Sequence, residues 1–150
     1  METKRMLKRD VAPAASYATA GSSANCDTMT AACVSELMNA GTSFHKLHLK
    51  ITGTGSYAAH KALNELYDAM PGHADDLAEG YQGASEKLLT YSESAPRKLE
   101  SVDDALSYIR DITEMVTGLQ AKVPYSEIVN DLDTIKSTIN SAKYKLLFLK

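Results

Sequence analysis

The chain has 150 residues and a mass of 16.2 kDa, which is the size of one ordinary domain. Hydrophobic residues make up 44% and charged residues 23% of it, so an intrinsically disordered chain is excluded. The sequence has no run of about 18 apolar residues, which excludes a membrane-spanning segment, and its net charge of −3 argues against uniform attraction to nucleic acid.

The first segment, residues 1–25, is predicted to be a flexible tail. Four basic residues outnumber two acidic ones there and give it a charge of +2, so residues 26–150 carry −5. The four basic residues are Lys4, Arg5, Lys8 and Arg9. The rest of the segment is rich in Ala, Ser, Thr and Gly and lacks the strong hydrophobes of a secretory signal. We therefore expect a basic arm that contacts DNA phosphates without reading sequence.

The two cysteines, Cys26 and Cys33, are too few for a disulfide framework. On one helix, seven positions apart, they would lie about 10 Å from each other, which is too far to form a bond. A reducing compartment, as in the cytoplasm, is the simpler interpretation.

The first half of the remaining sequence predicts two helices. The first begins at Asp27 and ends near Lys50, where ITGTG supplies β-branched residues and two glycines. Its predicted buried positions are Val34, Leu37, Met38, Gly41 and Phe44. Ser56 is predicted to cap the second helix, whose buried positions are Leu63, Leu66, Met70, Leu77 and Tyr81. Because the apolar spacing continues across Pro71 and Gly72, we expect one kinked helix there.

The second half predicts two further helices. The third has apolar positions at Leu99, Val102, Leu106, Ile109, Ile112, Val116 and Leu119. Ser101 and Asp104 are spaced as a capping pair at its start, and Gly118 and Pro124 bracket the turn that follows. The fourth has apolar positions at Ile128, Leu132, Ile135, Ile139, Ala142, Leu146 and Leu149. The expected fold class is all-α, with residues 26–150 forming one four-helix bundle.

Residues that suit a metal ion gather around the first interhelical loop. His48 lies at the end of the first helix and His60 on the first turn of the second, while Asp75 and Glu79 lie four positions apart further along. Imidazoles with carboxylates suit iron, manganese or zinc, and the oxygen donors favour iron. His60 and Asp75 are about 22 Å apart along one helix axis, so they cannot hold the same ion within one chain. A shared site requires a symmetric dimer, with histidines from one copy and carboxylates from the other.

Three stretches give the sequence a family resemblance: FHKLHLKITG, SYAAHKALNELYD and HADDLAEGYQG. Over about residues 30–150 it resembles Dps, the DNA-binding proteins from starved cells, a branch of the ferritin-like superfamily. The intervals between His48, His60, Asp75 and Glu79 agree with the ferroxidase ligands of that family. The resemblance implies a ferritin-like bundle that assembles into a hollow homo-oligomer, a dodecamer, with no membrane association. It also implies that the protein binds Fe(II) at dimer interfaces, oxidises it with peroxide or oxygen, stores ferric iron and protects DNA.

Some positions depart from the Dps pattern. The position where another acidic ligand is usual is Asn64, and Leu49 replaces a tryptophan. The Pro71–Gly72 pair falls in a helix that should be straight, and the segment between the second and third helices is short for the small crossing helix of the family. His45 is expected to be structural, whereas Glu65 and Asp76 are candidate second-layer or iron-entry groups.

The stretches SYAAHKALNELYD and GYQG also resemble small Dps-like proteins of bacteriophages. The resemblance implies a place in the cytoplasm of a bacterium or of an infected host, or in a virion, and it leaves a second function open. This is an oligomer of a virion or nucleoid that binds DNA or another protein without redox turnover. In that case Asp75 and Glu79 would be ordinary solvated charges.

Overall fold

The fold is an all-α four-helix bundle, as the apolar spacing predicts. The computed structural model describes residues 20–149, and its helices are α1 (Ala20–His48), α2 (Ser56–Ser85), α3 (Val102–Gln120) and α4 (Ser126–Phe148). No strand occurs within residues 20–149. None of the helices in this described part has the length and apolar character needed to cross a membrane.

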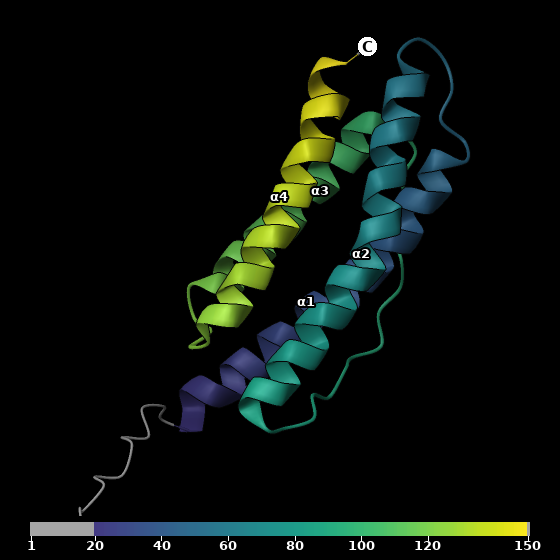
Figure 1. Ribbon diagram of the computed structural model, residues 1–150. Helices are drawn as coiled ribbons and strands as arrows, with labels where there is room; N and C mark the ends of the chain where they lie inside the picture. The colour runs from purple at the N-terminus through teal and green to yellow at the C-terminus, as the bar shows by residue number, and fades with distance from the viewer. Residues whose placement is uncertain (1–19, 150) are drawn as a thin grey trace, which may run out of the picture.

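The helices are joined as two antiparallel hairpins linked by one long connection (Figure 1). α1 packs against α2 and α3, and α4 packs against the same two helices. Residues 86–101 return along the length of the bundle, so α3 runs parallel to α2 (Figure 1). The end of α4 therefore lies at the same end of the bundle as the α1–α2 loop (Figure 1).

The core contains most of the positions that the sequence predicts to be buried. Leu37, Leu66, Ile109 and Ile135 are representative, with at most 1% of each residue exposed. Met38 is 49% exposed because it follows Leu37 directly and is turned about 100° away from the buried face of α1. Leu149 and Val102 were also predicted to be buried, but Leu149 is exposed and Val102 is only half-buried. Cys26 and Cys33 are both buried and free, as their spacing predicts.

Three helix boundaries differ from those predicted. α1 begins at Ala20 rather than Asp27, so residues 20–25 belong to the helix and not to a tail. Residues 1–19, with the predicted DNA-binding residues Lys4, Arg5, Lys8 and Arg9, lie outside the described part of the chain. Ser56 does not cap α2, because the cap is Gly55 in a left-handed conformation (φ 76°) that costs glycine little. Gly118 lies inside α3 rather than in the turn that follows it.

Pro71 lies within a single continuous α2, as predicted, and Figure 1 shows the axis of this helix changing direction near its middle. A Cβ atom added to Gly41 of α1 would lie 3.2 Å from Cγ and Cδ of Pro71. The glycine therefore allows α1 to pack closely against the proline ring.

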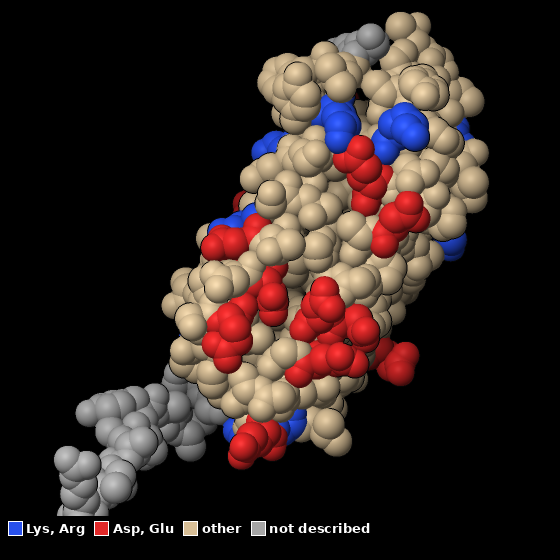
Figure 2. Space-filling view, viewed as in Figure 1, with Lys and Arg blue, Asp and Glu red and all other residues tan. Residues whose placement is uncertain are grey.

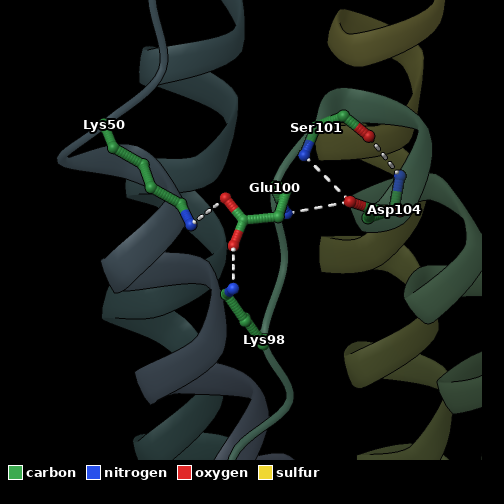
Figure 3. A network of polar contacts seen from close by, with 5 residues as sticks. All are labelled: Lys50, Lys98, Glu100, Ser101 and Asp104. Atoms are coloured by element: carbon green, nitrogen blue, oxygen red, sulfur yellow. Dashed lines mark hydrogen bonds and ion pairs between the residues drawn. The ribbon is translucent and has the colours of Figure 1, made fainter.

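The connection over residues 86–101 contains no helix, in agreement with its short length. Its C-terminal part is held by a network of charged side chains, in which Glu100 pairs with Lys50 at 2.7 Å and with Lys98 at 3.1 Å (Figure 3). Ser101 and Asp104 form the predicted capping box, because the Ser101 side chain accepts from the Asp104 backbone and Asp104 accepts from the Ser101 backbone (Figure 3).

Candidate metal centre

The α1–α2 loop brings the two predicted histidine ligands together. His48 is the last residue of α1 and is 8% exposed, and His60 is the fifth residue of α2 and is half-buried. Their imidazole rings are stacked, with centroids 3.7 Å apart and planes inclined by 24°. The close approach of these two rings, expected from the reversal of the chain between them, is confirmed.

Each histidine is held by the backbone of the other. Nδ1 of His48 donates to the carbonyl oxygen of His60 over 3.0 Å, and Nδ1 of His60 donates to the carbonyl oxygen of His48 over 3.3 Å. A carbonyl oxygen only accepts, so both Nδ1 atoms carry the proton. In the neutral imidazoles the two Nε2 atoms then keep their lone pairs. Metal-binding histidines commonly donate one ring N–H to a carbonyl in this way, which fixes the tautomer and the ring orientation.

A second aromatic layer surrounds the pair. The Tyr67 ring stacks on His45, with centroids 3.9 Å apart, and presents an edge-on contact to His48 at 4.9 Å. Tyr67 donates its hydroxyl hydrogen to Oδ1 of Asn64, and Nδ2 of Asn64 donates to Asp68. The Asn64 amide is thus bound on both sides. His45 packs on a ring, in keeping with the structural role expected for it.

The sequence interpretation missed Tyr67 and Asp68 in this cluster. The available signal was their spacing from Asn64, because residues three and four positions apart lie side by side on a helix.

The two predicted carboxylates do not join the histidines within one chain. Asp75 and Glu79 are exposed on α2 and, being four positions apart, share one face of it. Over residues 20–149, no group of three His, Cys, Asp or Glu side chains could hold a metal ion. One chain therefore supplies the histidine pair and, separately, the carboxylate pair.

The two predicted accessory acids have other partners. Glu65 forms an ion pair with Lys145 of α4, at 2.5 Å. Asp76 lies near His73 and near Asp131 of α4, close enough for its charge to act on both. Figure 2 shows acidic side chains spread over this α2–α4 face of the molecule.

The α2–α4 face also contains two groups with shifted pKa values. Burial lowers the pKa of His73, whose Nε2 is 2.9 Å from the Thr138 hydroxyl. Burial, followed by the charges of Asp76 and Glu127, raises the pKa of Asp131. Asp131 therefore lowers the stability of the fold when it ionises, and the cost is fully present at neutral pH.

Replacing Asp131 by asparagine is expected to stabilise the protein at pH 7. A raised folded-state pKa means that stability is lost as the pH rises through that value, and the neutral amide removes this loss. The gain should be below about 1 kcal/mol, because the site is partly solvated, and it should disappear towards pH 4. Urea denaturation of parent and variant at the two pH values measures it.

Asp133→Asn is the matched control on the same helix. Hydrogen bonds from Gln120 and Lys136 lower the pKa of Asp133, so its charge favours the folded state and the variant should lose stability at pH 7. Equal changes in the two variants would contradict the assignment.

The fold and the site together define a class: an all-α bundle of two hairpins with a backbone-anchored histidine pair at one end. The chain belongs to the family described as a family of unknown function, DUF5856, whose match covers residues 48–146 and so includes His48, His60, Asp75 and Glu79.

A relative from a bacteriophage supports the viral association suggested by the sequence. The chain is 29% identical over 110 residues to an uncharacterized 14.6 kDa protein in the mobD–ri intergenic region of Enterobacteria phage T4. The aligned part covers 73% of this chain and 81% of the phage protein. No solved structure matches the chain. Neither similarity is to a Dps or ferritin protein, so the resemblance to Dps rests on the motifs alone.

Proposed function

We propose that the protein is a Dps-like ferroxidase that binds Fe(II) as its substrate between two copies of the chain. His48 and His60 of one copy would hold the metal ion together with Asp75 and Glu79 of the second. The observation that supports this proposal is the reciprocal anchoring of the two imidazoles, in which both Nδ1 atoms donate to backbone carbonyls. This arrangement leaves the two Nε2 lone pairs for a ligand.

The donor set fits the oxidation of iron. Imidazole nitrogen binds first-row transition metals, and carboxylate oxygen offsets the additional positive charge when Fe(II) becomes Fe(III). Each Fe(II) gives up one electron. One molecule of hydrogen peroxide takes two electrons and two protons and leaves as two water molecules. The ferric product would be stored in a closed homo-oligomer, proposed to be a dodecamer, which would protect DNA by consuming both reagents.

The outer face of α2 favours the pairing that such a site needs. Antiparallel pairing of α2 with α2 of a second copy, centred between positions 60 and 75, brings each histidine pair towards the Asp75 of the other copy. In the same register Lys61 lies opposite position 74, next to Asp75, so exposed opposite charges come close to each other twice across the two-fold axis. Gly72 lies near the middle of this face, and a Cβ added there would meet nothing within 4 Å of its own chain.

Tight iron binding is therefore expected to require dimer formation. The variant Lys61→Glu brings like charges close to each other, and it should weaken both dimer formation and Fe(II) binding at least tenfold, or by about 1.4 kcal/mol. Sedimentation velocity and anaerobic Fe(II) titration measure the two effects. Lys98→Glu is the control, because Lys98 is 86% exposed and lies on the connection rather than on α2. A monomer that binds iron as tightly as the parent protein would contradict the shared site.

A second function is favoured by two other observations. The Asn64 amide is bound by Tyr67 and Asp68 where a carboxylate ligand is usual in Dps proteins. The relative described above is also a phage protein. The alternative proposal is a Dps-like oligomer of a virion or nucleoid that binds DNA, or another protein, without oxidising iron.

The proposed DNA contact is tested by removing residues 1–10. The loss of Lys4, Arg5, Lys8 and Arg9 should abolish retardation of DNA in a gel at low salt, because residues 26–150 carry a charge of −5. Any binding by the full chain should fall steeply with added salt, and several arms on one oligomer would strengthen it. Assembly and iron oxidation should not change. Equal retardation by the truncated and full chains would show that another surface binds DNA.

A further inference from the structure

Large apolar side chains are exposed together at one end of the bundle. Of the nine that are exposed within the described residues, six lie in the α1–α2 loop region or the last turns of α4. These six, which we call the apolar end, are Leu49, Tyr57, Tyr144, Leu147, Phe148 and Leu149. Scattered exposed hydrophobic residues are ordinary on a protein surface, but a group of this size at one place marks an interaction surface.

The apolar end contains both protruding side chains and a groove. Tyr57 and Phe148 are 77% and 68% exposed. Beside them lies a groove of about 460 Å³, lined by residues of the α1–α2 loop, the start of α3 and the end of α4. Its apolar lining includes Ile51, Ala59, Val102, Leu106 and Leu146. A surface that has a groove and a large projecting side chain can bind a copy of itself, because a two-fold contact places each projection opposite the groove of the other copy.

The exposed area and the nearby charges favour a second copy as the partner. A fully exposed aromatic or leucine side chain presents roughly 150–250 Å², so the apolar end exposes on the order of 700 Å². A standard protein interface buries about 800 Å² of each partner. Two lysines beside the apolar end are paired within the chain, Lys50 with Glu100 and Lys145 with Glu65. This internal neutralisation reduces repulsion between like copies, and it also reduces attraction to an anionic surface.

We propose that the apolar end is a self-association surface, through which two copies of the chain join end to end. Phe148 and Tyr57 of each copy contact the groove of the other. Phe148 and most of the groove lie off α2, so the end contact does not depend on iron binding, whereas Tyr57 lies on α2 one turn from Lys61 of the α2–α2 pairing. Together, two different self-contacts on one chain allow an assembly larger than a dimer.

The test is the double variant Tyr57→Glu with Phe148→Glu, compared with Leu88→Glu. Both replaced side chains are exposed, so circular dichroism should be unchanged. Leu88 is 89% exposed on the connection and serves as the control for adding a charge at an exposed leucine. Sedimentation equilibrium of the full chain should show that the double variant raises the dissociation constant for self-association at least tenfold, whereas Leu88→Glu leaves it unchanged.

Measurements in the Lys61→Glu background separate the two contacts. There the end contact should persist, and adding the double substitution should remove it. Hydrogen exchange at residues 144–149 should also slow with increasing concentration in the parent protein and not in the double variant. Unchanged association in the double variant overturns the proposal. A chain that stays monomeric and instead sediments with phosphatidylserine vesicles overturns it as well, in favour of a lipid surface.

Discussion

Replacing His48 by alanine is expected to slow Fe(II) oxidation at least tenfold, and Asp75→Ala should have a similar effect. Each variant removes one proposed donor to the substrate ion, and a tenfold loss corresponds to about 1.4 kcal/mol in the barrier. His48→Ala also removes one of the two hydrogen bonds that anchor the histidine pair. Without the His48 imidazole, His60 loses its stacking partner as well. The initial rate at which the absorbance of ferric iron rises after Fe(II) is mixed with peroxide measures the effect.

The controls are residues of the same type outside the proposed site. His73→Asn replaces a histidine that faces Thr138 of α4, and Glu114→Gln replaces an exposed carboxylate of α3. Both should oxidise iron at the parental rate, and all four variants should keep parental helicity. If His48→Ala and Asp75→Ala also oxidise iron at the parental rate, the histidine and carboxylate pairs do not form a ferroxidase site. The non-enzymatic oligomer would then be the better proposal.

Replacing Arg97 by alanine is expected to destabilise the fold by about 1–2 kcal/mol. The Arg97 guanidinium lies 4.1 Å from the centroid of the Tyr108 ring, and it forms ion pairs with Glu36 of α1 and Asp111 of α3. Its backbone N–H also donates to the Ser43 hydroxyl. One side chain thus joins the connection to both hairpins, and its loss leaves the largely buried Glu36 carboxylate without its cation.

Thermal unfolding measures this effect, which should lower the melting temperature by several degrees. The matched control is Lys98→Ala at the neighbouring position. Lys98 is 86% exposed, and its ion pair is with the exposed Glu100. A surface change of this kind should remain within about 0.5 kcal/mol of the parent. Hydrogen exchange over residues 86–101 should quicken in Arg97→Ala and not in Lys98→Ala. Equal stability of the two variants would show that the connection is held by its other contacts.

The fold was largely predictable because long apolar spacing leaves few alternatives. Ile128 to Leu146 recur every three or four positions, and the Ser101–Asp104 spacing correctly located the start of α3. The predicted cap of α2, Ser56, was wrong. The cap is Gly55, which begins the helix through its left-handed backbone conformation and without a side-chain hydrogen bond. The role of Arg97 gave no local signal, since its partners are 11 or more positions away in the sequence.

The candidate site was predictable only in part. The approach of His48 and His60 follows from a short loop between two helix ends, but their exchange of backbone hydrogen bonds depends on tertiary geometry. The contact between Tyr67 and His45 likewise depends on how α1 packs against α2. The joining of these histidines with Asp75 and Glu79 stays a prediction, because it requires a second copy of the chain.

The two-hairpin arrangement has a consequence for how the chain reaches its fold. Within each hairpin most contacts link residues close in sequence, so each can form early and locally, as in other helical proteins of low contact order. Docking of the hairpins must close the loop over residues 86–101, but the entropy of closure grows only with the logarithm of loop length. Added residues within the exposed stretch 91–96 should therefore cost the fold little stability. The chain is suited to an insertion there, which would carry a label between the two hairpins and leave the packing of each one in place.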